Sequence, residues 1–88
     1  VTERGLEEIP AVVHVDGTTR PQTVKRGECP EYRRIIEIVE KEVGVGAVLN
    51  TSMNIHGEPI VCSPSDAIKT FKRGLMDYLA IGNYLLRK

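Results

Sequence analysis

PEYRRIIEIVEKEVGVGAVLN, residues 30–50, is the stretch that decides the fold, because its hydrophobic period changes within it. Apolar residues first recur at the i, i+3, i+4, i+7 and i+11 spacing of one helical stripe, at Tyr32, Ile35, Ile36, Val39 and Val43. Pro30 suits the first turn of this helix, and Gly44 is a natural stop. Residues 46–49 then predict a buried strand. A helix followed directly by a strand indicates an α/β or α+β unit.

Two extended stretches are predicted on the N-terminal side of this helix. AVVHV, residues 11–15, predicts a short strand that ends at the turn signal Asp16-Gly17. A second extended stretch at residues 21–24 is placed to pair with the first. Residues 1–8 carry no strong pattern, and we expect the core to continue upstream of them.

The C-terminal side predicts a second helix and two more strands. In SPSD, residues 63–66, Ser63 has the character of an N-cap, Pro64 of a first-turn residue, and Asp66 of an N3 residue that reaches back. The buried side of this helix is expected to consist of Ala67, Ile68, Phe71 and Leu75, with Gly74 at its end. Strands are predicted at residues 78–82 and 84–86. The expected fold class is therefore α/β, with α+β as the open alternative, in one partial domain over residues 1–88.

The composition is that of a small soluble protein without a strong charge bias. The 88 residues are 41% apolar and 27% charged, which allows one domain with a modest core. The 12 basic and 12 acidic residues cancel, which argues against sequence-independent binding to nucleic acid or to an anionic membrane. No apolar run approaches the ~20 residues of a bilayer span. Cys29 and Cys62 lack metal-site spacing, so we expect free thiols, no metal site and a cytoplasmic location.

The densest polar cluster, NTSMN at residues 50–54, directly follows the predicted strand 46–49. Ligands of open α/β sheets bind beyond the carboxyl ends of strands. Hydroxyls of Thr51 and Ser52 and amides of Asn50 and Asn54 suit a phosphorylated or carbonyl-bearing ligand. The alternative is a loop whose polar side chains satisfy their own backbone, and composition alone favours it.

A second candidate, DGTTR at residues 16–20, follows the predicted strand 11–15. Arg20 carries a permanent charge on a planar fork that can grip a phosphate at two points, and Thr18 adds a hydroxyl. The alternative is an exposed hairpin tip with a solvated arginine. His14 and His56 have no partner at metal-ligand or catalytic-triad spacing, and no acid/base pair stands out. No catalytic residue is therefore assigned in this chain.

Three segments together resemble a known family. AVVHVDGTTRPQTV (residues 11–24), VLNTSMNIHGEPIVCSPSDAIKTF (48–71) and LAIGNYLLRK (79–88) are similar to the C-terminal region of the NodU/CmcH-type carbamoyltransferases. NTSMNIHGEP also resembles the Ser-x-Asn signature of YrdC-like domains, which make acyl-adenylates from ATP. This resemblance implies a YrdC-like mixed sheet with two helices, and it runs from about Ile9 to Lys88.

The resemblance implies an ATP-dependent O-carbamoyltransferase. In such enzymes the YrdC-like domain joins a carbamoyl group from carbamoyl phosphate to AMP, with Mg²⁺ expected alongside ATP. A larger N-terminal domain of the same parent chain, which resembles actin-like ATPases and carries iron, then passes the carbamoyl group to an acceptor hydroxyl. By this resemblance Arg20, Ser52 and Asn54 hold phosphate, carbamoyl or nucleotide groups, with Asn50, Thr51 and Thr18 beside them.

This sequence departs from the family pattern at two points. Met53 stands where the family usually has Phe, and the lysine and arginine that YrdC-like sites use upstream have no counterpart here. We therefore expect an inactive fragment when the chain is isolated, with a bare sheet edge that favours a homodimer. One alternative is a stand-alone YrdC-type nucleotide- or RNA-binding module without transferase activity. Another is a purely structural oligomerisation domain.

Overall fold

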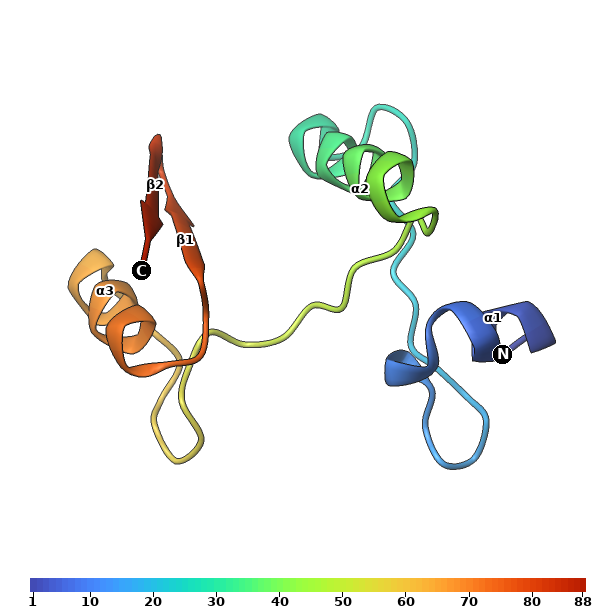
Figure 1. Ribbon diagram of the computed structural model, residues 1–88, viewed down its shortest axis with the longest axis horizontal. Coiled ribbons are helices and arrows are strands. Elements are labelled where there is room, and N and C mark those ends of the chain that lie inside the picture. The colour runs from blue at the N-terminus through green and yellow to red at the C-terminus, as the bar shows by residue number, and fades with distance from the viewer. The chain divides into compact units, whose positions relative to one another are not determined.

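A computed structural model describes residues 1–88 of the chain. The chain divides into two compact units, Val1–Asn50 and Thr51–Lys88, which are described in turn. The predicted class, helices combined with a sheet, is confirmed. Along the chain the elements are α1 (Glu3–Glu8), the 3₁₀-helix η1 (Pro10–Val12), α2 (Pro30–Val43), α3 (Pro64–Arg73), β1 (Tyr78–Ile81) and β2 (Tyr84–Arg87), as labelled in Figure 1.

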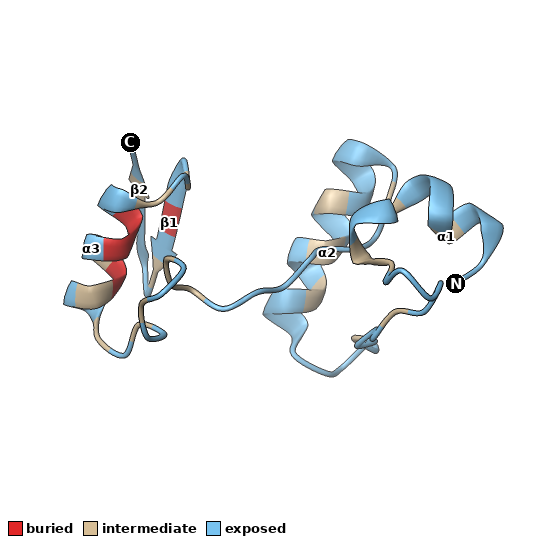
Figure 2. Ribbon diagram, turned by 90° about the horizontal axis from the view of Figure 1, so that it is seen from below, coloured by how far each residue is buried: buried red, intermediate tan, exposed pale blue.

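Helix α2 dominates the first unit, and both of its predicted ends are confirmed. It begins at Pro30, after Cys29 in a left-handed conformation, and Gly44 closes it with a φ of 83° and an N–H bonded to the Glu40 carbonyl. Gly44 adopts this conformation without the clash that a Cβ would cause. No residue of α2, and none of the first 50, is buried (Figure 2). Its apolar stripe is therefore largely uncovered, and local bonds and caps hold the helix within this unit.

The predicted strands at residues 11–15 and 46–49 are wrong, and the extended stretch at residues 21–24 does not pair with residues 11–15. Residues 10–12 form η1 instead, because Pro10 fixes its own φ and has no N–H to donate to a ladder. His14 then donates its N–H to the Thr18 carbonyl at 2.8 Å and closes a turn. Residues 46–49 run without a ladder partner, and Leu49 is 66% exposed. A stretch with strand propensity becomes a strand only when another strand pairs with it, and none does so here.

Helix α1 was not predicted. The Thr2 hydroxyl accepts a hydrogen bond from the Gly5 N–H at 3.1 Å and caps the helix start. Arg4 and Glu8 pair at 2.7 Å one turn apart. In the sequence, only the capping hydroxyl of Thr2 and the i,i+4 pair of Arg4 and Glu8 indicated this helix. The helix is too short to show a hydrophobic period.

The second unit begins with the predicted helix start. The Ser63 hydroxyl accepts from the Asp66 N–H at 3.1 Å and donates to the Asp66 carboxylate at 2.6 Å, with Pro64 in the first turn. This arrangement confirms Ser63 as N-cap and Asp66 as the residue that reaches back. The predicted burial of Leu75 is wrong, since Leu75 is 101% exposed. Helix α3 ends at Arg73, so the helical period no longer applies at Leu75.

Strands β1 and β2 form an antiparallel hairpin, and this hairpin is the whole sheet. Ile81 faces Tyr84 in the register, which leaves Gly82 and Asn83 as a two-residue turn. Gly82 has a φ of 55°, as the first turn position of a type II′ hairpin requires. The mixed sheet that was expected is therefore a two-stranded antiparallel one, because the stretches that would have widened it find no partner.

The core of the second unit lies between α3 and β1. Helix α3 runs beside the hairpin in Figure 1, and the buried positions in Figure 2 fall on these two elements alone. Its members are Ala67, Thr70, Phe71 and Leu79. Half-buried side chains surround them, among them Met53 and Val61 from the preceding loop. None of the helices combines the length and apolar character needed to span a bilayer.

Candidate functional site

The DGTTR segment forms a tightly bonded turn. The Asp16 carboxylate accepts from the Thr18 hydroxyl at 2.7 Å and from the Thr18 N–H at 3.0 Å. Both bonds stabilise the charged carboxylate and so lower the pKa of Asp16, and the bond from the Thr18 hydroxyl has the larger effect. Next to it, the Thr19 hydroxyl donates to the Val12 carbonyl at 2.7 Å. The turn therefore holds the chain entering Arg20 in place.

Arg20 and Asn50 line the same broad groove of the first unit, together with Tyr32 and Arg33 of α2. The two were predicted as ligand-binding residues from separate stretches of sequence, and the structure brings them to one surface. Arg20 is exposed, and the three ion pairs of the structure do not involve it. Its guanidinium is therefore free to meet an anion. Thr19 also lines the groove, whereas the predicted Thr18 does not.

Arg33 holds the segment that follows Arg20, a role that the sequence did not suggest. Its Nη1 donates to the Val24 carbonyl at 2.9 Å, and its Nε donates to Glu37 at 2.8 Å. The second bond is the first cause of a lowered pKa at Glu37. Arg33 thereby ties the extended segment 21–24 to α2 on one wall of the groove. The i,i+4 spacing of Arg33 and Glu37 was the available signal.

The Ser-x-Asn loop of the second unit is closed by its own hydrogen bonds. The Ser52 hydroxyl lies 2.6 Å from Asn54 Oδ1, and Asn54 Nδ2 lies 2.9 Å from the Glu58 carbonyl and 3.4 Å from the Ile55 carbonyl. The Val61 N–H bonds to the Met53 carbonyl at 3.1 Å at the base of the loop. Ser52 is exposed and Asn54 is half-buried.

The loop is also anchored from outside. The Glu58 carboxylate pairs with Arg73 in the last turn of α3. Met53 and Val61 pack against the buried core of the second unit. Met53 therefore occupies an apolar environment, which also suits the Phe that the family usually has at this position. The loop is therefore held by its own bonds, by an ion pair and by two apolar contacts.

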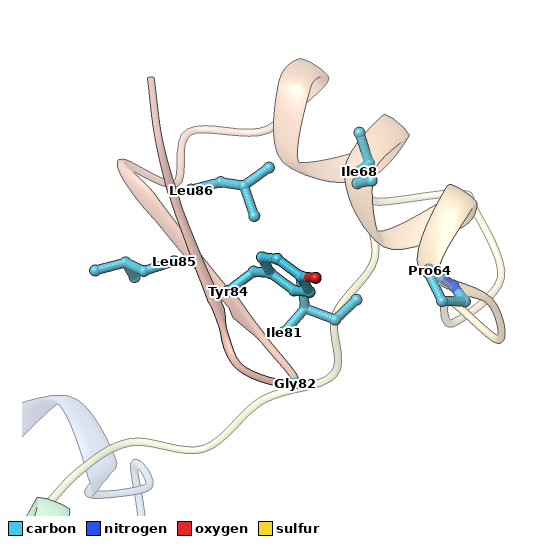
Figure 3. Close-up of a pocket in the computed structure, with 7 residues that line it drawn as sticks. All are labelled: Pro64, Ile68, Ile81, Gly82, Tyr84, Leu85 and Leu86. Carbon is cyan, nitrogen blue, oxygen red and sulfur yellow. The ribbon is translucent and has the colours of Figure 1, made fainter.

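A second groove, between α3 and the hairpin, is apolar. Figure 3 shows Ile81 and Leu86 of the hairpin facing Ile68 of α3, with Tyr84 at its centre. Pro64, Gly82 and Leu85 complete the lining. No charged side chain lines this groove, so it offers no counter-charge for a phosphate.

The predicted site residues fall in both units. Thr18, Arg20 and Asn50 belong to the first, and Thr51, Ser52 and Asn54 to the second. That they meet around one ligand stays a prediction. No three His, Cys, Asp or Glu side chains gather as metal ligands, and Cys29 and Cys62 are exposed free thiols. His14 and His56 are both exposed.

Comparison with known proteins places these residues in a family. The family described as carbamoyltransferase C-terminus matches residues 1–88, the whole chain. The chain belongs to this family. The resemblance inferred from the DGTTR and NTSMN segments is thus confirmed, and the general class of the family is carbamoyl transfer.

Several relatives of this carbamoyltransferase C-terminal chain are much longer proteins. An uncharacterized protein of Methanocaldococcus jannaschii is 48% identical over 88 residues, which are 100% of this chain and 17% of that protein. Nodulation protein NolO of Bradyrhizobium diazoefficiens is 47% identical over 78 residues, 89% of this chain and 14% of that protein. The 3'-hydroxymethylcephem-O-carbamoyltransferase of Amycolatopsis lactamdurans is 38% identical over 68 residues, 76% of this chain and 13% of that protein. The chain thus spans less than a fifth of the length of these relatives.

Proposed function

We propose that this chain supplies part of the site at which an ATP-dependent O-carbamoyltransferase makes carbamoyl-adenylate. In this reaction carbamoyl phosphate, ATP and water give carbamoyl-adenylate, phosphate and pyrophosphate. A further domain of the parent protein would then transfer the carbamoyl group to an acceptor hydroxyl. The observation that carries the proposal is that Arg20, which forms no ion pair, and Asn50 line one groove of a carbamoyltransferase-family chain.

The groove has the chemistry that phosphoryl transfer needs. Such reactions depend chiefly on positioning and on neutralising the charge of phosphate oxygens. Arg20 offers a planar fork with no internal ion pair, and the Asn50 amide offers donor and acceptor together. The bonded turn before Arg20 and the Arg33 tether after it fix the chain on either side of residue 20, while the guanidinium itself stays exposed. Arg20 and Asn50 are therefore assigned to phosphate and carbamoyl oxygens.

Thr51, Ser52 and Asn54 of the second unit are proposed to contact phosphate, carbamoyl or nucleotide groups, and Thr18 to support the turn before Arg20. Mg²⁺ is expected to accompany ATP. A Mg²⁺ that accompanies ATP would be held by phosphate oxygens and water. The iron implied by the resemblance belongs to the transfer domain.

Substitution of Arg20 in the complete gene product tests the proposal. The assay is exchange of labelled pyrophosphate into ATP in the presence of carbamoyl phosphate. Loss of one charge-assisted contact of about 1.5–3 kcal/mol predicts a fall in kcat/KM of about 10- to 150-fold for Arg20→Ala. Arg20→Lys should lie between, because it keeps the charge and loses the fork.

Arg34→Ala is the matched control, since Arg34 is an exposed cation of α2 that does not line the groove. It should stay within about twofold of the wild type, as surface substitutions usually do. An Arg20→Ala protein that also stays within this range would contradict the assignment of Arg20. A wild-type protein without exchange dependent on carbamoyl phosphate would contradict the proposed reaction.

A further inference from the structure

A single hydrogen bond, from Arg33 of α2, holds the segment that follows Arg20. Arg33 Nη1 donates to the Val24 carbonyl at 2.9 Å, and the structure shows no other hydrogen bond of residues 20–24. The bond joins two stretches nine residues apart in sequence and lies on one wall of the groove that Arg20 lines. The place of this segment on the groove wall therefore depends on the Arg33 side chain.

The guanidinium of Arg33 is itself held in one orientation. Its Nε donates to the Glu37 carboxylate at 2.8 Å, one turn further along α2. This bond is the largest cause of the lowered pKa of Glu37, so the carboxylate is ionised at neutral pH. Two donors of one planar group thus face two acceptors, the Glu37 carboxylate and the Val24 carbonyl. A lysine ammonium lacks this fork and does not reproduce the pair of contacts.

The backbone between this tether and Arg20 is stiff. Pro21 fixes its own φ and restricts the preceding residue, Arg20, to extended conformations. On the other side of Arg20, the Thr19 hydroxyl donates to the Val12 carbonyl at 2.7 Å. The backbone of Arg20 thus lies between two anchored points, and a shift of Val24 is passed on to it.

We propose that Arg33 is a positioning residue for Arg20, which it places by holding the Val24 carbonyl against α2. Arg33 then acts on the ligand through Arg20. The inference rests on the proposed function, because the placement of Arg20 matters only if its guanidinium meets the phosphate oxygens. Accurate placement has a large effect on catalysis, since a shift of about 1 Å can lower a rate about 100-fold.

A double-mutant cycle between Arg20 and Arg33 tests the inference in the complete gene product, by pyrophosphate exchange. With Arg20 present, Arg33→Ala should lower kcat/KM about 5- to 50-fold, within the coupling range of residues that share one network. In the Arg20→Ala background the same substitution should change kcat/KM less than about twofold, because no guanidinium is left to place. A general loss of stability would affect both backgrounds alike.

Three further variants complete the design. Arg33→Lys keeps the charge and one bond to segment 21–24, so it should recover part of the lost kcat/KM. Glu37→Ala releases Arg33 Nε and should cause a smaller loss, again only when Arg20 is present. Arg34→Ala removes a neighbouring cation that also acts on Glu37 but makes no bond to the segment, and it should stay within about twofold of the wild type.

Circular dichroism with heating checks that each variant retains the fold. If Arg33→Ala does not fold, the same cycle is measured with Glu37→Ala, which leaves the bond to Val24 in place.

The outcomes separate this inference from the proposed function. Equal losses from Arg33→Ala in both backgrounds would show that Arg33 acts independently of Arg20, and would overturn the inference while leaving the role of Arg20 intact. An Arg33→Ala protein within about twofold of the wild type would overturn it as well. If Arg20→Ala itself leaves pyrophosphate exchange unchanged, the proposed role of Arg20 is wrong, and its placement by Arg33 is wrong with it.

Discussion

Phe71→Ala is expected to abolish most of the stability of the second unit. Phe71 is 4% exposed and is the largest side chain of a buried core that otherwise holds Ala67, Thr70 and Leu79. Truncation of a buried Phe costs about 3–5 kcal/mol. No side chain here is less than 2% exposed, so the surroundings can relax, and we expect the lower end, about 3 kcal/mol. A unit of this size should have a free energy of unfolding of about 2–6 kcal/mol.

Urea unfolding followed through the NMR signals of β1 and β2 measures this loss. The two strands report on the core because Leu79 of β1 packs within it and Leu86 of β2 lies opposite in the register. Leu85→Ala is the matched control in the same hairpin, since Leu85 is 70% exposed and should cost less than about 0.5 kcal/mol. Phe71→Ala could instead lower the free energy of unfolding by less than about 1 kcal/mol, or Leu85→Ala could lower it by as much as Phe71→Ala does. Either result would refute the claim that the contact between α3 and β1 stabilises this unit.

Three further predictions concern acid, ATP and association. The pKa of Asp66 is lowered from its usual 3.8, chiefly by the hydrogen bond from Ser63 and next by the one from Cys62. The ionised Asp66 carboxylate therefore stabilises the folded state above pH 3.8, and this stabilisation is lost as the pH falls through the folded pKa. Circular dichroism from pH 5 to pH 2 should show a loss of α3 helicity with this titration. Ser63→Ala should weaken this pH dependence, because Cys62 and Lys69 still lower the pKa of Asp66. The isolated chain should bind ATP weakly and form no adenylate, because the upstream lysine and arginine that YrdC-like sites use have no counterpart in it. A micromolar affinity for ATP measured by calorimetry would contradict this. Exposed apolar side chains such as Ile35 of α2, and the free edges of the hairpin, predict self-association as a twofold dimer, and light scattering from a monomer at all dilutions would disprove it.

Local signals in the sequence were sufficient for the helices α2 and α3 and for the hairpin. Ser63 and Asp66 cap α3 by bonds that span three residues, and Gly44 ends α2 through its own backbone conformation. The turn at Gly82 lies between two stretches with strand character, so both strands find their partner within a few residues. Each of these features depends on near neighbours in the chain, and for that reason the residue types alone predict it.

The failures occurred where a distant partner was required. Residues 11–15, 21–24 and 46–49 have strand propensity, yet they pair with nothing in the structure. A ladder needs two backbones side by side, and propensity does not specify the second one. The burial of Leu75 failed for a related reason, since the helical period was extended past the residue where α3 ends.

For the candidate site, the sequence by itself determined which side chains are present and to which family the segments belong. Arg20, Asn50, Ser52 and Asn54 were named from two polar stretches, and that choice required only residue type and spacing. The tertiary structure decided that Arg20 and Asn50 share a groove and that the Asn54 amide is spent on the Glu58 carbonyl. Residue type fixes how many donors and acceptors a side chain carries. Which of them remain for a ligand depends on the atoms that the fold places around it.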